Sequence, residues 1–169
     1  MATPAHRATE TKAVGRRAAP LDALKLLKAD HDEVAALLDK YEGLGERTKA
    51  PTKHKLALDI CGKLTVHATI EEEIFYPAVK EAVDEAEDLL AEAEVEHGSL
   101  KDLIAKIERQ DGEGAEFDAL VTVLGEYVRH HVKEEQNELF PKVRKSDLDL
   151  AKLGAALAER KQQLMRDEA

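Results

Sequence analysis

Apolar residues recur at three- and four-residue intervals along most of the chain, which is the spacing of one buried face of an α-helix. The first such stretch places Leu24, Leu27, Val34 and Leu38 on one face. Runs of alternating or β-branched residues, which would indicate strands, do not occur. We therefore predict four long helices and one shorter helix, at about residues 21–41, 52–83, 84–110, 115–140 and 148–165.

Glycine and proline separate these stretches. "GLGERTKAP" follows the first helix and "DGEG" follows the third. Because proline lacks an amide hydrogen, we expect Pro77 to end or kink the second helix near its end and Pro141 to end the fourth. Four long helices with short connections predict an all-α, antiparallel up-down four-helix bundle. We predict a flexible tail at residues 1–19, the bundle at 20–142 and a C-terminal helical extension at 143–169.

Two pairs of segments repeat within the chain. "HATIEEEIFYP" begins at His67 and "HVKEEQNELFP" at His131; both have glutamate four residues after the histidine and proline ten residues after it. "HDEVAALLDKYE" from His31 and "HGSLKDLIAKIE" from His97 share Leu, Lys and Glu at the same offsets. This duplication predicts two similar helical hairpins packed about a pseudo-twofold axis.

The repeated segments place polar residues on the buried faces. His67 and Glu71 are four residues apart, or about 40° around a helix axis, so both face inward. Burying a carboxylate costs several kcal/mol without compensation, and no Lys or Arg shares these faces. A cation is therefore the expected partner, although a buried hydrogen-bond network is the structural alternative. Four imidazoles and two carboxylates suit two first-row transition-metal ions, with the predicted ligands His31, His67, Glu71, His97, His131 and Glu135.

In these residues the chain resembles the hemerythrin-like family, or HHE cation-binding domain, whose pattern is His, then His-x-x-x-Glu, and then both again. The resemblance covers Leu21 to Pro141. It implies that the six residues bind two iron ions, bridged by Glu71 and Glu135 and by an oxo or hydroxo group. It also implies a non-heme di-iron protein that binds, senses or detoxifies dioxygen, nitric oxide or peroxide, or that handles iron.

Two other functions stay open. One is a di-iron enzyme with peroxidase-like, catalase-like or oxidase activity at the same six ligands. The other is an interaction module with a structural metal, in which the last helix contacts a partner protein. Imidazole and carboxylate ligands also accept manganese or zinc.

The chain departs from the oxygen-carrying hemerythrins, which have a fifth histidine one turn after the ligand on the third helix. Lys101 occupies that position. Tyr127 and Glu138 lie on the predicted inward stripe and are candidates to replace this ligand. A ferritin-like site requires Glu-x-x-His on two helices. Glu94 and His97 form one copy, but Lys28 precedes His31, so the second copy fails.

Composition narrows the partners and the compartment. The net charge of −10 over 169 residues argues against nucleic-acid binding, which needs clustered basic residues. No apolar stretch is long enough to span a membrane. The single cysteine, Cys61, allows no intrachain disulfide and favours a reducing compartment, so we expect a cytoplasmic protein. We expect Cys61 to pack in the core and His54 and His130 to be exposed.

Overall fold

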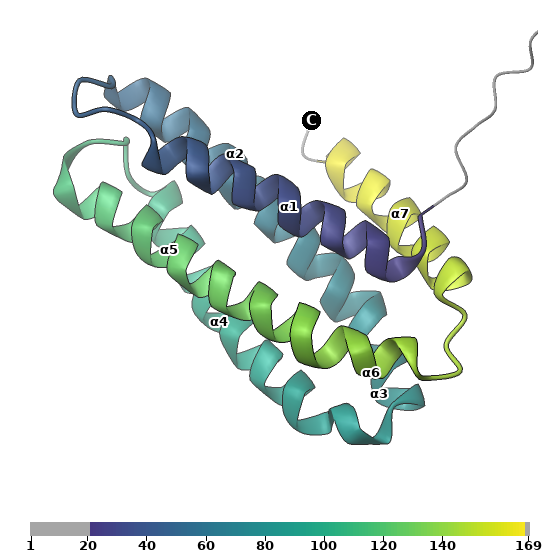
Figure 1. Cartoon of the computed structure of the whole chain (residues 1–169). Helices are drawn as coiled ribbons and strands as arrows, with labels where there is room; N and C mark the ends of the chain where they lie inside the picture. The colour runs from purple at the N-terminus through teal and green to yellow at the C-terminus, as the bar shows by residue number, and fades with distance from the viewer. Residues whose placement is uncertain (1–20, 168–169) are drawn as a thin grey trace, which may run out of the picture.

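A computed structural model describes residues 21–167, and all regular structure in this part of the chain is helical (Figure 1). The predicted all-α bundle with an additional C-terminal helix is confirmed. The predicted tail at residues 1–19 lies outside the described residues. The long helices are α1 (Ala23–Glu42), α2 (Ala50–Ile70), α4 (Glu87–Glu108), α5 (Gly114–Glu134) and α7 (Leu150–Asp167). Between them lie the π-helical turns η1 (Glu71–Phe75) and η3 (Glu135–Leu139), the short helices α3 (Tyr76–Ala82) and α6 (Phe140–Arg144), and the 3-10 turn η2 (Asp84–Ala86).

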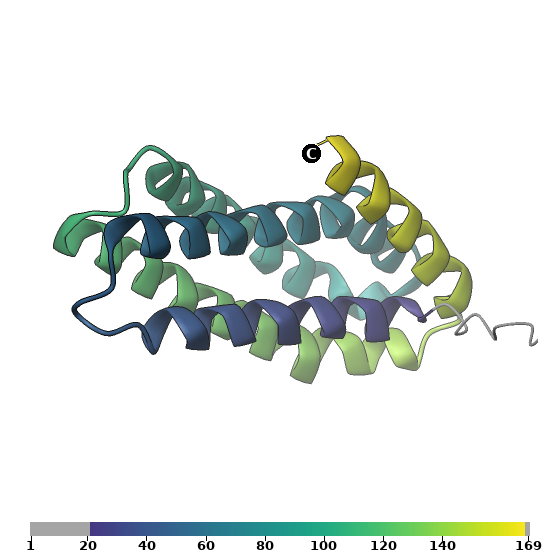
Figure 2. The ribbon, with the colours of Figure 1, turned by 90° about the horizontal axis from the view of Figure 1, so that it is seen from above.

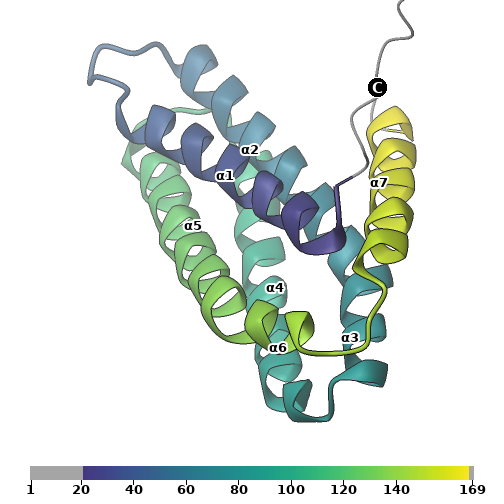
Figure 3. The same cartoon turned by 45° about the vertical axis from the view of Figure 1, so that its right-hand side comes forward.

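Four helices form the bundle. Helix α1 packs against α2 and α5, and α4 packs against the same two helices, so α1 and α4 occupy opposite corners. The view from above shows the helices of the bundle running side by side, with α7 crossing them at an angle (Figure 2). Helix α7 lies outside this square, against α1, α2 and η1 (Figure 3).

Local sequence explains where the helices begin. The Asp22 side chain accepts a hydrogen bond from the Lys25 amide at 2.9 Å and so caps α1. Pro51 occupies the first turn of α2, where its missing amide hydrogen costs nothing. Gly112 before α5 has φ +89°, and a Cβ atom there would lie 2.6 Å from the Cβ of His54. Only glycine suits this turn, because an L side chain would be strained and would collide with α2.

Each proline expected to break a helix follows a π-helical turn, and the chain stays helical past it. Pro77 follows η1 by two residues, and Pro141 follows η3 by two residues. The prediction that Pro141 ends the fourth helix is wrong, since α6 continues to Arg144. A proline ring normally clashes with the carbonyl four residues earlier. Here that carbonyl belongs to the wider π-helical turn, which leaves room for the ring.

The buried apolar residues form two clusters along the bundle. One surrounds Phe75, Phe140 and Leu157, and the other surrounds Ile60, Phe117 and Leu124. A layer of buried polar residues lies between them, and it contains all six predicted ligands. None of the helices in residues 21–167 is both long and apolar enough to cross a membrane.

Candidate metal centre

The six predicted ligands converge in the middle of the bundle, and none is more than 6% exposed. His31 comes from α1, His67 from α2, His97 from α4 and His131 from α5. Each glutamate is the first residue of a π-helical turn, Glu71 in η1 and Glu135 in η3. Repeated sequence segments therefore supply equivalent side chains from the two hairpins, as the duplication predicts.

The first cluster comprises His31, His67, Glu71 and Glu135. The two histidines approach through Nε2, with 3.0 Å between these atoms. His67 Nε2 lies 3.1 Å from Glu71 Oε1, and His31 Nε2 lies 3.2 Å from Glu135 Oε2. Four potential ligand atoms thus surround one point and lie within 4.8 Å of one another.

The second cluster comprises His97, His131 and again Glu71. The Nε2 atoms of its histidines are 3.1 Å apart, and His97 Nε2 lies 3.4 Å from Glu71 Oε2. Glu71 thus points one oxygen at each cluster. Glu135 also reaches both, because its Oε2 lies 3.6 Å from His131 Nε2. Two carboxylates placed between two histidine pairs are arranged to bridge a pair of cations.

Two buried carboxylate oxygens indicate that cations fit between the two histidine pairs. Among the described residues, Glu71 Oε1 and Glu135 Oε2 have no hydrogen-bond partner of good geometry; the nearest groups are His67 Nε2 at 3.1 Å and His31 Nε2 at 3.2 Å. When Nδ1 carries the histidine proton, Nε2 has only a lone pair to offer, so neutral histidines leave both oxygens unsatisfied at a cost of a few kcal/mol, and either a second proton or a metal cation is needed. Mixed imidazole and carboxylate ligands suit divalent first-row transition metals, so the donors present fit the expected cations.

All four histidines are held at Nδ1 by residues adjacent to other ligands. His67 Nδ1 lies 3.3 Å from Asp30, and His131 Nδ1 lies 2.6 Å from Glu96. Each of these carboxylates directly precedes a ligand histidine in the sequence. Hydrogen bonds at Nδ1 orient each ring and leave Nε2 for a metal.

The other two histidines follow the same rule with residues that come directly after the glutamates. His97 Nδ1 lies 2.9 Å from Glu72, and His31 Nδ1 lies 3.0 Å from the Gln136 amide nitrogen. The oxygen and nitrogen of an amide side chain can exchange places, so the Gln136 oxygen can instead accept a hydrogen bond from the Nδ1–H of His31. The duplicated sequence could have indicated all four partners.

Electrostatics couple the histidines to the carboxylates. Burial lowers the pKa of His67, but Glu71 and Asp30 outweigh it and raise that pKa to about 10. Burial raises the pKa of Glu71, yet His67 and His97 bring it well below its usual range. Burial likewise lowers the pKa of His131, but Glu96 and the carboxylates of Glu135 and Glu71 outweigh burial, so the pKa of His131 is raised. Without metal, a proton therefore takes the place of a cation at the cluster.

Tyr76 is a polar residue of the centre that the sequence did not predict. Its hydroxyl donates to Glu135 Oε1 at 2.8 Å and lies 3.3 Å from both Glu71 Oε2 and His97 Nε2. Burial and the two carboxylates raise its pKa well above the usual value, so it stays a phenol. Phe140 occupies the equivalent place in the other hairpin and stacks on His31, with ring centroids 5.9 Å apart.

The expectation that Tyr127 or Glu138 points toward the centre is wrong, because both are exposed. Leu124 and Val128 lie on one side of His131 around the helix, whereas Tyr127 lies about 40° to the other side, toward solvent. Glu138 falls in η3, where the wider turn rotates it away from the stripe. Lys101 also points outward and pairs with Glu72 at 2.6 Å.

A small apolar chamber adjoins the histidines. It measures about 40 Å³ and is enclosed by the ligand rings together with Val34, Leu64, Leu100, Ile104 and Val128. On this scale one water needs about 10–15 Å³, so the chamber has room for a molecule of two or three heavy atoms.

The sequence also predicted the burial or exposure of three other residues, Cys61, His130 and His54, and two of these three predictions are confirmed. Cys61 is fully buried, as predicted, and its burial raises the pKa of the thiol to about 12. His130 is exposed, as predicted. The expectation for His54 is wrong: it is half-buried, because its ring lies 6.0 Å from that of Phe117 and the Gly112 turn covers its Cβ.

The family model of the hemerythrin HHE cation binding domain matches residues 22–143. Helix α7 lies beyond the matched residues. The crystal structure of a hemerythrin HHE cation binding domain-containing protein from Mycobacterium kansasii is similar, with a TM-score of 0.71 and 23% sequence identity over 85% of this chain and 87% of that one. This likeness shows the shared fold.

A curated relative is the DNA nickase of Nostoc sp. (strain PCC 7120 / SAG 25.82 / UTEX 2576). It is 28% identical over 119 residues, which are 70% of this chain and 32% of the nickase. The chain therefore spans about a third of the length of this relative.

Proposed function

Because the chain belongs to the hemerythrin HHE cation-binding domain family, we propose that its buried cluster holds two iron ions and that this centre binds dioxygen, nitric oxide or peroxide. The six ligands would be His31, His67 and Glu135 with Glu71 for one ion, and His97 and His131 with Glu71 for the other. The iron pair would supply the electrons for the chemistry of the bound ligand.

The observation that carries this proposal is the position of Glu71. Its Oε1 lies 3.1 Å from His67 Nε2, and its Oε2 lies 3.4 Å from His97 Nε2. A single metal would use one histidine pair and leave the other pair and an anionic oxygen buried without a partner. Two cations account for both pairs and for the two unsatisfied oxygens.

The surrounding residues support binding of a small uncharged ligand. The chamber beside the histidines is walled by aliphatic side chains, which favour dioxygen or nitric oxide over ions and exclude bulk water. The four Nδ1 contacts keep each imidazole aimed inward, which preserves the site between ligand exchanges.

Tyr76 favours a second candidate, an enzyme that consumes peroxide. Cleavage of a peroxide needs a proton at an oxygen, and the Tyr76 phenol holds one 2.8 Å from Glu135. Repeated turnover of hydrogen peroxide would identify the enzyme, whereas stoichiometric and reversible binding would identify a carrier or sensor.

We infer no nucleic-acid partner for this chain, despite the match to a DNA nickase. The net charge is −10, and the matched region is about a third of that protein. The lone Cys61 is compatible with a reducing compartment, and we propose the cytoplasm.

The test is iron loading under anaerobic conditions followed by addition of oxygen, nitric oxide or peroxide. We expect about two irons per chain and a visible absorption change on ligand addition. His97→Ala should lose at least one iron, while the matched control His130→Ala, at an exposed histidine, should keep both. Protein that takes up no iron when it is supplied in excess would refute the proposal.

A further inference from the structure

Helix α7 lies beyond the family match, yet it is closely fitted to the bundle. Leu157 is fully buried in the apolar cluster that contains Phe75 and Phe140. At Gly154 a Cβ atom would lie 2.4 Å from the carbonyl oxygen of Leu21, so glycine lets the α7 backbone touch the start of α1. The position of α7 is therefore fixed by packing.

Two adjacent cations of α7 reach the elements that carry the metal ligands. Arg160 donates to both oxygens of Glu73 in η1, at 2.6 and 3.1 Å. Lys161 forms a short contact with Asp30 Oδ1. The other oxygen of Asp30 lies 3.3 Å from Nδ1 of His67. A continuous chain of contacts thus runs from α7 through Asp30 to a ligand of the first cluster.

In the part of the chain that the structure describes, the equivalent carboxylate in the other hairpin, Glu96, has no lysine partner. Glu96 accepts from His131 Nδ1 at 2.6 Å, and its other recorded partner is the exposed His130 at 3.5 Å. Among residues 21–167, the lysine near the second cluster is Lys101 of α4, which pairs with Glu72, the partner of His97 Nδ1. Of these two lysines, only Lys161 comes from α7, outside the four-helix bundle. The two clusters therefore have matching ligands but unequal surroundings.

We propose that Lys161 is a positioning residue of the metal centre, which holds Asp30 against His67 and thereby strengthens metal binding in the first cluster. This rests on the proposed metal site. With its Oδ1 engaged by Lys161, Asp30 has one oxygen left for His67, and the histidine ring keeps Nε2 aimed at the cluster. Lys161 also balances the charge of Asp30, so that this buried carboxylate is tolerated beside Glu71.

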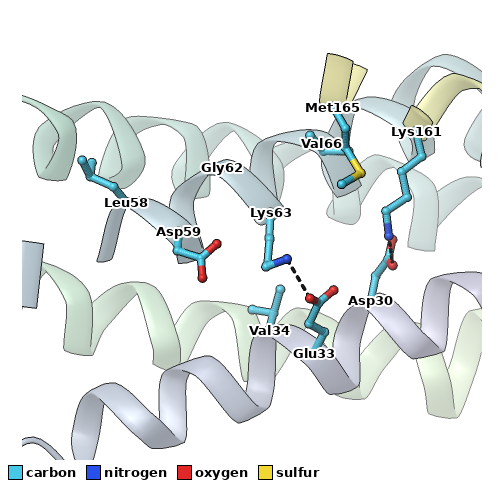
Figure 4. A pocket seen from close by; sticks show the side chains of 10 residues that line it. All are labelled: Asp30, Glu33, Val34, Leu58, Asp59, Gly62, Lys63, Val66, Lys161 and Met165. Carbon is cyan, nitrogen blue, oxygen red and sulfur yellow. Dashed lines mark hydrogen bonds and ion pairs between the residues drawn. The ribbon is translucent and has the colours of Figure 1, made fainter. Parts of the chain in front are cut away.

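A neighbouring ion pair offers a matched comparison. Lys161 and Lys63 both line a cavity of about 430 Å³ between α1, α2 and the end of α7 (Figure 4). Lys63 pairs with Glu33 at 2.7 Å, and the Glu33 side chain is 51% exposed. The Asp30 side chain is 8% exposed and contacts His67. Within residues 21–167, the side-chain partner of Glu33 is Lys63, and no hydrogen bond or ion pair joins Glu33 to the predicted ligands. Removing either lysine removes one charge from the same cavity, but only Lys161 is connected to His67.

The experiment measures Co(II) binding to the full chain, by competition with a chelator and by the visible absorption of bound Co(II). We expect the unaltered protein to bind two Co(II). In Lys161→Met one of the two affinities should fall about tenfold and the Co(II) absorption should change, because loss of partners that orient ligands typically costs 10–100-fold. Lys161→Arg should restore both. Asp30→Asn should lower the affinity for the same Co(II) ion by about 10–100-fold.

Lys63→Met should leave both affinities within about twofold of the unaltered protein. Circular dichroism of each metal-free variant checks that the helices are intact. Equal effects of Lys161→Met and Lys63→Met, or no effect of Lys161→Met on a protein that binds two Co(II), would overturn the inference alone. An unaltered protein that binds no Co(II) would overturn both the inference and the proposed metal site.

Discussion

The two helical hairpins carry the same ligands but surround them differently. Residues 23–82 and 87–144 each supply two histidines and a glutamate from equivalent positions. Beside these ligands, the first hairpin has Tyr76 where the second has Phe140. Lys161 pairs with Asp30, while no lysine among the described residues pairs with Glu96. Duplication accounts for the two proposed cation positions, and the differences make these positions chemically distinct.

The largest effect should come from the residue that both clusters share. Glu71→Gln removes the negative charge from both, so we expect affinity for both metals to fall by about 100-fold or more, with a matching loss of thermal protection by metal. Metal analysis and thermal unfolding with and without iron measure this. Glu73→Gln is the matched control in the same turn, because Glu73 is partly exposed and pairs with Arg160. Equal loss in both variants would show that the turn, and not the Glu71 carboxylate, matters.

The next prediction concerns pH and the protonated His67. The folded pKa of His67 is about 10, above its ordinary 6.5, so the metal-free fold binds this proton more tightly than the unfolded chain. The resulting stability is fully present below pH 6.5 and is lost as the pH rises through 10. We expect the free energy of unfolding of metal-free protein to fall by at most about 1.4 kcal/mol per pH unit in this window.

Denaturant unfolding of metal-free protein between pH 6 and 9 tests this slope, and His67→Gln should flatten it. Metal affinity should change in the opposite direction, since ligands must lose their protons to bind a metal. Metal-free protein whose stability rises over this range would contradict the prediction.

A smaller effect should distinguish Tyr76 from the exposed Tyr127. Tyr76→Phe leaves Glu135 Oε1 buried without its hydroxyl donor, so we expect metal-free protein to lose about 1–3 kcal/mol of stability. Tyr127→Phe, at a side chain that is 49% exposed, should change stability by less than about 0.5 kcal/mol. Equal effects in denaturant unfolding would mean that the Tyr76 hydroxyl is not part of the buried network.

Helical periodicity and the internal repeat together predicted the bundle and brought six polar residues to one layer. The periodicity fails at the π-helical turns, whereas the repeat holds there, because η1 and η3 lie at equivalent positions. At 3.6 residues per turn, Tyr76 lies about 180° from His67 and Glu138 about 20° from His131, so the first is predicted to face out and the second in. The extra residue in each turn reverses both predictions.

The contact between Lys161 and Asp30 shows a different limit. Asp30 lies about 100° from His31 around α1, at the edge of the buried stripe, and its partner is supplied by α7. Local spacing carries no information on which helix will cover that edge. Packing of α7, set by Leu157 and Gly154, decides it.

The smallest effects should come from positions six residues before His67 and His131, where the hairpins have Cys61 and Gly125. Cys61→Ala removes a buried sulfur and should cost about 1 kcal/mol. Gly125→Ala gains about 1 kcal/mol of helix propensity, but the new Cβ lies 3.3 Å from a Leu38 methyl carbon and from an Arg129 nitrogen. In Gly125→Ala, we expect the gain in helix propensity and the cost of the close contacts to cancel within about 0.5 kcal/mol of unfolding free energy, measured by thermal unfolding. The metal content should not change. A loss above about 2 kcal/mol in Gly125→Ala would mean that α1 and α5 cannot adjust there, and that this part of the second hairpin is packed more tightly than its counterpart.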